Sequence, residues 1–263
     1  MEKRTTVLDF QQKCDKGEKL TVVTAYDYSM ALAVDAAGVD AILVGDSLNM
    51  TMLGRPNTLS VTLEEMLHHT RAVAAGTKAA MVIGDMPFLS YQFGPEQALE
   101  NAGPFLAGAG AQAVKIEWCP EAPAITEFLV ENGIPVMGHV GFTPQQIHRL
   151  GGYHQQGKDT ASMARLLRQA KALEQAGAFS IVLELVPDET AWKITQTLSI
   201  PTIGIGAGPR CDGQVQVLHD MLGLLPDFHP KHAKAYLKLH EVIRDAVKRY
   251  VEEVKSGKFP PAP

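Results

Sequence analysis

Four apolar runs in this chain each end on an acidic residue, and carboxylates are groups that bind hard cations and take up protons. The runs end at Asp46, Asp85, Glu117 and Glu184. In a barrel of parallel strands, the C-terminal ends of all the strands open on one catalytic mouth. Several carboxylates gathered there repel one another unless a cation lies between them. The pattern therefore predicts a barrel, a metal site and proton-transfer chemistry together.

The candidate metal ligands are Asp46, Asp85 and Glu117. Both aspartates follow a glycine at a strand end, and glycine lets a ligand approach the backbone closely. Mg²⁺ commonly takes one or two protein carboxylates and completes its shell with water and substrate. A single aspartate in this position would more simply cap the next helix. Two aspartates, with Glu117 on a third strand end, favour the metal site.

Lys115 lies two residues before Glu117, so both side chains point to the same side of their strand, which in a barrel is the interior. A lone buried lysine is costly, whereas one that faces carboxylates or an anionic substrate is satisfied. We therefore expect Lys115 to bind an anionic substrate. A structural Lys–Glu pair is the alternative, and the two roles are compatible.

Glu184 ends an apolar segment, which favours a raised pKa and a role as general base. A structural, paired glutamate fits the spacing equally well. His139 lies in another apolar run, where a satisfied core histidine is more common than a metal ligand. The glycines of residues 204–208 suit either a phosphate loop or a tight turn.

The elements that would position these residues alternate between strand and helix. We predict strands near residues 21–26, 41–46, 80–85, 113–117, 135–140, 180–185, 201–205 and 215–219. Apolar stripes at helical spacing predict helices over 63–74, over 164–173 with an end at Gly177, and from about Lys231 to Val254. The length of 263 residues is close to the roughly 250 of one (β/α)₈ barrel. We expect a single α/β barrel domain over 1–263 with a helix after each strand and a short frayed C-terminal tail.

Composition narrows the function classes. The formal net charge of −5 gives no reason to expect nucleic acid or an anionic membrane as partner. No apolar stretch approaches the roughly 20 residues of a membrane span, and the first residues lead into no signal-like apolar segment. Three widely spaced cysteines predict a reducing compartment, so we expect a cytoplasmic enzyme with small-molecule partners.

Two connections are long, and both leave the C-terminal ends of predicted strands. One follows Asp46 and the other follows Val140, with Gly151-Gly-Tyr153 in its second half. Long ordered loops at this end of a barrel are often lids or walls of a binding site, although a plain surface excursion is the alternative.

The chain resembles the ketopantoate hydroxymethyltransferase family over nearly its whole length. The resemblance rests on many short segments in the same order, among them Val44-Gly-Asp-Ser-Leu48, Gly84-Asp-Met-Pro-Phe88, Val114-Lys-Ile-Glu117, Gly138-His-Val-Gly141, Thr143-Pro-Gln145, Gly151-Gly-Tyr153 and Ile203-Gly-Ile-Gly-Ala-Gly208. The chain departs from the family's usual residues at Asn49, Trp118-Cys119, His154-Gln155 and Leu185. These departures leave the presumed catalytic groups in place and affect the loop after Glu117 and the lid near Tyr153.

The resemblance implies a TIM barrel of the phosphoenolpyruvate mutase/isocitrate lyase type and a homo-oligomer, usually a decamer of two pentameric rings. It implies that Asp46 and Asp85 hold Mg²⁺, with Glu117 reaching the ion directly or through water. It also implies that Asp46, Ser47, Asp85 and Lys115 bind the 2-oxo acid and that Glu184 is the base.

The reaction implied is hydroxymethyl transfer from 5,10-methylenetetrahydrofolate to 3-methyl-2-oxobutanoate, which gives 2-dehydropantoate for pantothenate and coenzyme A synthesis through a Mg-stabilised enolate. Two alternatives stay open. A lyase of the same superfamily would share the metal site, although the Lys-Lys-Cys-Gly-His segment of isocitrate lyases is absent. A non-catalytic barrel would not need four acids and a lysine at one mouth.

Overall fold

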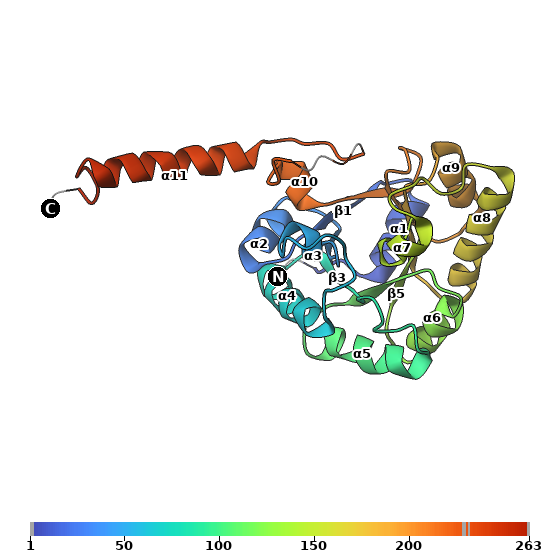
Figure 1. Ribbon diagram of the computed structural model, residues 1–263. Coiled ribbons are helices and arrows are strands. Elements are labelled where there is room, and N and C mark those ends of the chain that lie inside the picture. The colour runs from blue at the N-terminus through green and yellow to red at the C-terminus, as the bar shows by residue number, and fades with distance from the viewer. Residues whose placement is uncertain (1–2, 228–229, 231, 262–263) are drawn as a thin grey trace. The chain divides into compact units, whose positions relative to one another are not determined.

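The computed structural model describes residues 3–227, 230 and 232–261, and they form two compact units, Met1–Gln216 and Val217–Pro263. The first unit is a closed barrel of parallel strands, each paired with its neighbours in sequence order (Figure 1). The strands are β1 (Leu20–Thr24), β2 (Ala41–Val44), β3 (Met81–Asp85), β4 (Ala113–Glu117), β5 (Val136–Gly141), β6 (Ser180–Glu184), β7 (Thr202–Ile205) and β8 (Gly213–Gln216). Pairing of β1 with β8 closes the barrel, so the predicted fold class is confirmed.

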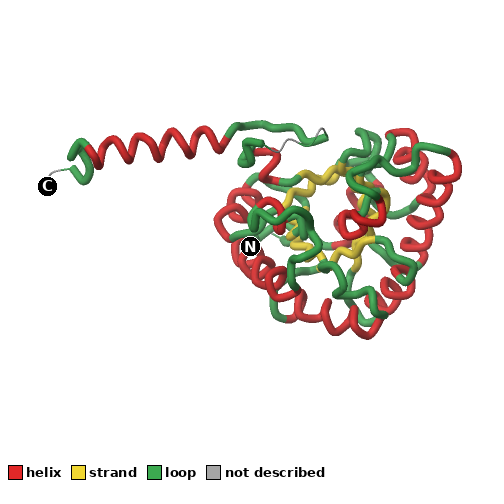
Figure 2. Tube along the Cα trace, viewed as in Figure 1, coloured by secondary structure: helices red, strands yellow, loops and turns green. Residues whose placement is uncertain are grey.

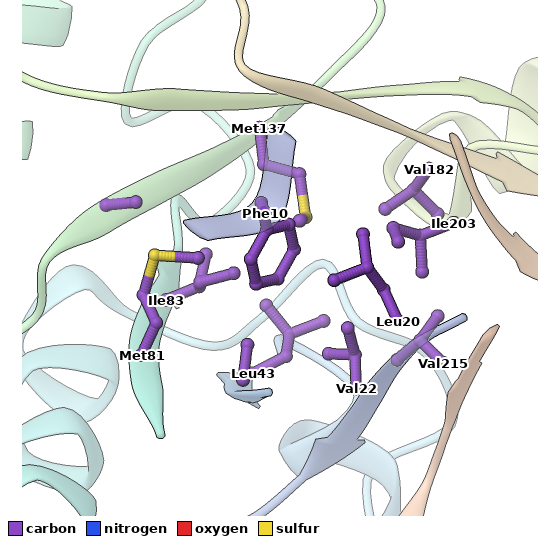
Figure 3. Packing of buried hydrophobic residues seen from close by; sticks show 12 residues of the cluster. Phe10, Leu20, Val22, Leu43, Met81, Ile83, Met137, Val182, Ile203 and Val215 are labelled. Atoms are coloured by element: carbon purple, nitrogen blue, oxygen red, sulfur yellow. The ribbon is translucent and has the colours of Figure 1, made fainter. Parts of the chain in front are cut away.

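The barrel interior is filled by side chains at alternate strand positions, as the two-residue period of a strand requires. Figure 3 shows this cluster, which contains Leu20, Val22, Leu43, Met81, Ile83, Met137, Val182, Ile203 and Val215. Two residues further along each strand, the next side chain points to the same side as the core residue. Ile83 is followed in this way by Asp85, Met137 by His139 and Val182 by Glu184. The apolar core thus passes directly into a layer of ionisable side chains at the C-terminal ends of the strands.

A helix that the sequence analysis did not predict, α1 (Val7–Asp15), precedes the first strand. Thr6 and Asp9 form a capping box at its start, which satisfies backbone N–H groups that the helix leaves free. Phe10 is fully buried in the barrel cluster (Figure 3), and its ring meets that of Phe179 edge to face, with 5.8 Å between centroids. Helix α1 therefore contributes a large side chain to the barrel core.

Helices connect the strands and surround them, as Figure 2 shows in red around the yellow strands. They are α2 (Tyr28–Ala36), α3 (Leu48–Thr51), α4 (Leu63–Gly76), α5 (Pro95–Ala107), α6 (Ala122–Glu131), the 3₁₀ turn η1 (Pro144–Gln146), α7 (Ile147–Leu150), α8 (Thr160–Gln175) and α9 (Asp188–Thr197). The helices predicted over 63–74 and 164–173 are confirmed as α4 and α8. Strand β2 is buried along its whole length, as expected when both faces of a sheet are covered.

One expectation was wrong: β7 and β8 are joined by residues 206–212, which are all described and contain no helix. Asp212 stabilises this short connection, because its carboxylate accepts hydrogen bonds from the Thr202 backbone N–H at 2.8 Å and from the Thr202 hydroxyl at 2.9 Å. The eighth strand also begins and ends earlier than predicted, at Gly213–Gln216 instead of 215–219.

The second unit contains α10 (Leu218–Leu222) and α11 (Leu239–Lys255). The last helix was predicted to begin near Lys231, which lies outside the described residues, but it begins at Leu239. The chain just before α11 and the first turn of α11 form hydrogen bonds with the end of α10 and the residue after it. The Tyr236 N–H donates to the Met221 carbonyl at 2.7 Å, and the His240 N–H donates to the Gly223 carbonyl at 3.3 Å. The predicted frayed tail includes Ala262 and Pro263, which also lie outside the described residues.

Helix α11 carries an apolar stripe whose side chains are exposed: Val242, Ile243, Val247, Tyr250, Val251 and Val254.

The expectation of one domain over 1–263 stays a prediction. Within the described part of the chain, no helix has both the length and the apolar character needed to cross a bilayer.

Candidate active site

A buried ion pair lies at the C-terminal ends of β3 and β4. Asp85 and Lys115 are register partners, and the Lys115 ammonium donates to Asp85 Oδ1 at 2.7 Å. Both side chains are nearly inaccessible to solvent. Burial lowers the pKa of Lys115, but the negative charges of Asp85, Glu117 and Asp46 outweigh burial and raise it. Lys115 is therefore a fixed positive charge inside the mouth.

Asp46 follows β2 and lies directly beside Asp85, because its backbone N–H donates to Asp85 Oδ2 at 3.2 Å. Burial, and then the charge of Asp85, raise the pKa of Asp46 to about 7. The single ammonium of Lys115 thus interacts with the carboxylates of Asp46, Asp85 and Glu117, so negative charge exceeds positive charge at this site. A proton or a further cation is needed to balance the charge.

Glu117, at the end of β4, is 1% exposed. Its Oε2 accepts a hydrogen bond from the Gln145 backbone N–H at 3.0 Å, whereas its Oε1 has no hydrogen-bond partner among the described residues. Burial raises the pKa of Glu117 well above its usual value. A buried oxygen without a partner is available to a ligand or a water.

Two residues that the sequence analysis gave no role, Gln145 and Tyr91, connect these carboxylates. Gln145 Nε2 donates to Asp46 Oδ2 at 3.1 Å and to the Met86 carbonyl at 2.9 Å. Tyr91 donates to Gln145 Oε1 at 2.8 Å, and the Glu117 N–H reaches the Tyr91 hydroxyl at 3.1 Å. The sequence signals were the position of Gln145 in the long connection after β5 and its place in the matching segment Thr143-Pro-Gln145, which carried no role.

His139, on β5, lies between two glutamates from the neighbouring strands β4 and β6. Its Nε2 is 3.3 Å from Glu184 Oε2 and its Nδ1 is 3.8 Å from Glu117 Oε1. Neither ring nitrogen makes a hydrogen bond within the described residues. Burial, and then the charge of Lys115, hold the pKa of His139 well below its usual value, so the imidazole is neutral.

The two long loops also contribute to the mouth. Ser47, in the first loop, shares a hydrogen bond of 2.8 Å with the Tyr26 hydroxyl. In the second loop, the ring of Tyr153 packs against Phe142 with 4.9 Å between centroids. Burial, and then the charges of Glu184 and Asp46, raise the pKa of Tyr153. The phenol of Tyr153 is therefore close enough to these carboxylates to be affected by their charge.

The glycine segment 204–208 has the geometry of a turn. Gly208 has φ +79°, and a Cβ there would lie 2.4 Å from Asp188 Oδ1. A carboxylate at that position repels phosphate, so the turn explains these glycines better than a phosphate loop does.

The structure brings Asp46, Asp85, Lys115 and Glu117 into one network and places Glu184 beside His139. Among the described residues, however, no group of three His, Cys, Asp or Glu side chains is arranged to hold one metal ion. The assignment of Asp46, Asp85 and Glu117 to one metal ion, with Glu117 reaching it directly or through water, stays a prediction. A site with two carboxylates, substrate and water stays compatible with this geometry.

Comparison with protein families gives one match that spans almost the whole chain. Residues 4–262 match the family model described as ketopantoate hydroxymethyltransferase. A relative from Clostridium botulinum (strain Langeland) is 52% identical over 257 residues, covering 98% of this chain and 94% of the relative. A relative from Chloroflexus aurantiacus (strain J-10-fl) is 55% identical over 258 residues, covering 98% and 91%. Both are named 3-methyl-2-oxobutanoate hydroxymethyltransferase.

The solved structures that resemble this one share its fold at low sequence identity. Phosphoenolpyruvate phosphomutase from Streptomyces platensis superposes with a TM-score of 0.64 at 15% identity, over 96% of this chain and 88% of that one. A 2,3-dimethylmalate lyase, described as a PEP mutase/isocitrate lyase superfamily member, gives 0.60 at 16%, over 98% and 90%. A phosphonopyruvate hydrolase in complex with oxalate and Mg²⁺ gives 0.63 at 14%, over 96% and 88%.

Proposed function

The chain belongs to the ketopantoate hydroxymethyltransferase family, and from this premise we propose roles for the residues at its barrel mouth. Its activity is that of a 3-methyl-2-oxobutanoate hydroxymethyltransferase in pantothenate biosynthesis. This identity implies methylenetetrahydrofolate as the one-carbon substrate. The observation that carries the site proposal is the convergence of Lys115, Asp85, Asp46 and Glu184 at the inner ends of the strands.

The oxo acid binds at Asp46, Ser47, Asp85 and Lys115. The buried ammonium of Lys115 attracts the anionic substrate, because a charge in a water-poor site is weakly screened. The Ser47 hydroxyl, held by Tyr26, offers a hydrogen bond at the edge of the same site. These contacts orient the ketone and its neighbouring C–H inside the mouth.

The donor set of this site fits Mg²⁺. Asp46 and Asp85 supply hard oxygen ligands. Burial, and then the charge of Asp85, raise the pKa of Asp46 to about 7 although Lys115 lowers it. The unpartnered Oε1 of Glu117 would bind a water of the metal shell. Mg²⁺ in this position supplies Lewis-acid stabilisation of the charge that develops on the ketone oxygen. The phosphonopyruvate hydrolase of the same fold, solved with oxalate and Mg²⁺, supports the choice of metal.

Glu184 takes the proton from C3 of the oxo acid. The carboxylate lies at the inner end of β6, and its Oε2 is 3.3 Å from the neutral ring of His139. An N–H of that ring would orient the carboxylate toward the substrate, as positioned bases require. The carbanion at C3 then forms a bond to the methylene carbon of the folate as the first of that carbon's two C–N bonds breaks. The second C–N bond breaks as water supplies the new hydroxyl group. The two folate nitrogens take up the proton removed from C3 and the remaining proton of the water, so tetrahydrofolate leaves.

The proposal is tested by following 2-dehydropantoate formation with and without methylenetetrahydrofolate. Product that forms only with folate, together with solvent exchange of the C3 deuteron without it, is the expected result. Cleavage of a C–C or P–C bond in an oxo acid without folate would instead identify a lyase. If neither reaction took place, the non-catalytic barrel would be the remaining interpretation.

We further propose that the chain forms a homo-oligomer, a decamer by resemblance to the family, and that it acts in the cytoplasm. The exposed apolar stripe of α11 supports the first point. The free thiols of Cys14, Cys119 and Cys211 support the second, since they suit a reducing compartment.

A further inference from the structure

Two adjoining cavities lie beside the carboxylate network at the barrel mouth. The inner cavity, about 240 Å³, is lined by Glu117 and Gln145 and by the rings of Phe88 and Tyr91. The outer cavity, about 200 Å³, extends to α8. The two share the lining residues Trp118, Pro120, Gln146 and Arg149. The two cavities are therefore neighbours across these four residues.

Gln145 lies between the inner cavity and the reaction site, since it lines the cavity and its side chain donates to Asp46 Oδ2 at 3.1 Å. A group bound in the inner cavity is thus one side chain away from the proposed metal ligand. The outer cavity extends from Trp118 and Gly141 to α8.

The outer cavity is positively charged. Arg149 and Arg165 line it, and no aspartate or glutamate does. Arg149 donates to the neutral Gln146 Oε1 at 2.9 Å, and within the described chain neither arginine forms an ion pair. Two other arginines in loops at this end of the barrel are neutralised, because Arg55 pairs with Glu65 at 2.8 Å and Arg210 with Asp188 at 2.7 Å.

Folates have three parts in a fixed order: a pterin that carries the reactive methylene, an aminobenzoyl ring and a glutamate with two carboxylates. The cavities offer matching chemistry, because Trp118 and Arg149 line both of them and Arg165 lines the outer one. Guanidinium groups bind carboxylates through paired hydrogen bonds, and aromatic rings stack on one another.

We propose that the outer cavity binds the glutamate tail of methylenetetrahydrofolate, with Arg149 and Arg165 on its carboxylates and Trp118 against its aminobenzoyl ring. This assignment rests on the proposed function, since it places the second substrate of the same reaction. It also gives Trp118, a departure from the family's usual residue, a contact with substrate.

The test compares Arg149→Gln, Arg165→Gln and the double variant with Arg168→Gln. Arg168 is exposed on the same helix as Arg165, three residues further on, and does not line the cavity. We expect each cavity substitution to raise the KM for methylenetetrahydrofolate about 10-fold and the double variant about 100-fold, the range of a charged hydrogen bond. Arg168→Gln should leave this KM at the parent value.

A substrate without the tail separates tail recognition from general damage. With methylenetetrahydropteroate, which lacks the glutamate, the parent and the double variant should have the same KM. Calorimetry should detect p-aminobenzoylglutamate binding to the parent and to Arg168→Gln but not to the double variant. Equal folate KM values in the parent and the double variant, or an equal loss with the tailless substrate, would overturn the assignment.

Deuteron exchange of the oxo acid without folate distinguishes a failure of the proposed function from a failure of the cavity assignment. If the parent neither exchanges the deuteron nor forms product, the proposed function fails. If it does both and the arginine substitutions have no tail-dependent effect, only the cavity assignment fails. Exchange by each variant also verifies that it is folded.

Discussion

Two carboxylates at the mouth, Glu184 and Asp46, have different surroundings, and this difference separates their roles. The Glu184 side chain is 15% exposed and lies against neutral His139, so it can exchange protons with a substrate and with solvent. Asp46 is 4% exposed and touches a second carboxylate, which favours a bound cation. The proposed base and the proposed metal ligand are therefore different groups with different surroundings.

Substitution of Glu184 by glutamine should lower turnover by about 10²–10⁴-fold, because a positioned base contributes that much and the amide keeps the shape without the basicity. Oxo-acid binding should persist, since its contacts lie on β2, β3 and β4. The measurement is solvent exchange of the C3 deuteron without folate. Exchange at the parent rate in Glu184→Gln would show that another group is the base, and His139→Asn would be tested next.

Removal of divalent metal should abolish turnover, and Mg²⁺ should restore it, because the carboxylates of Asp46 and Asp85 lack a full counter-charge without it. Asp46→Ala should weaken Mg²⁺ binding, measured by calorimetry, and lower activity even at high Mg²⁺. Metal-free Asp46→Ala with full activity would contradict the metal assignment.

The pKa of Asp46 also predicts a pH dependence of stability in metal-free protein. The folded pKa of about 7 lies above the unfolded value of 3.8, so the folded state binds more protons between these values. The free energy of unfolding should therefore fall as pH rises from about 4 to 7, on the order of a few kcal/mol. Urea unfolding measures this slope. It should become shallower in Asp46→Asn and when Mg²⁺ is added, and a slope unchanged in Asp46→Asn would contradict the assignment.

Most of the network could be predicted from sequence because strand periodicity places side chains two residues apart on one face. That rule placed Lys115 and Glu117 on one side of their strand, and the end of an apolar run identified Glu184. Tyr91 lies in an irregular segment and Gln145 in a single 3₁₀ turn, both too short for a period to link position to direction. Their contacts depend on how separate loops meet, so only the structure places them.

At the scale of the elements, the strand ends are coupled through the turn after β5. Gly141 has φ +101°, and the Phe142 N–H donates to the Glu184 carbonyl at 2.8 Å. A Cβ on Gly141 would lie 2.3 Å from that carbonyl oxygen. The position of the proposed base thus depends on the absence of a side chain on the neighbouring strand.

Gly141→Ala should lower turnover at least 10-fold, because a displacement of the base by even 1 Å is costly. It should also lower the free energy of unfolding by more than Gly133→Ala does. Gly133 is the matched control, with φ +81° and open space around its Cβ, so its substitution carries only the backbone strain of about 1–2 kcal/mol. Activity and urea unfolding check both variants. Equal effects of the two substitutions would contradict the coupling.

The elements predicted well were those with a strong period or a buried run, such as β3, β4, α4 and α8. Helix α1 escaped prediction because the stretch around Phe10 is short and mostly polar, and only the barrel core explains the burial of that ring. The start of α11 was misplaced because the stripe from Tyr236 onward looks helical, whereas the backbone there bonds to the end of α10.

At the scale of the whole molecule, the apolar stripe of α11 predicts self-association. Light scattering at micromolar concentration should give a mass several times the 28.5 kDa of the chain. Val247→Glu together with Tyr250→Glu should lower the mass if the stripe forms the contact, since burying unpaired charge is costly. Val242→Ile is the matched control and should keep the assembly. A parent of monomer mass would contradict the prediction.

The closure of the barrel by β1 and β8 has a consequence for the time at which the protein can fold. Leu20 pairs with Gly213, so roughly 190 residues must leave the ribosome between the two partners, which takes about 10–40 s at the usual rate of synthesis. Throughout that interval β1 presents an unpaired strand edge, the kind of surface on which nascent chains aggregate. A chain truncated before Gly213 keeps two such edges, on β1 and β7, for its whole lifetime.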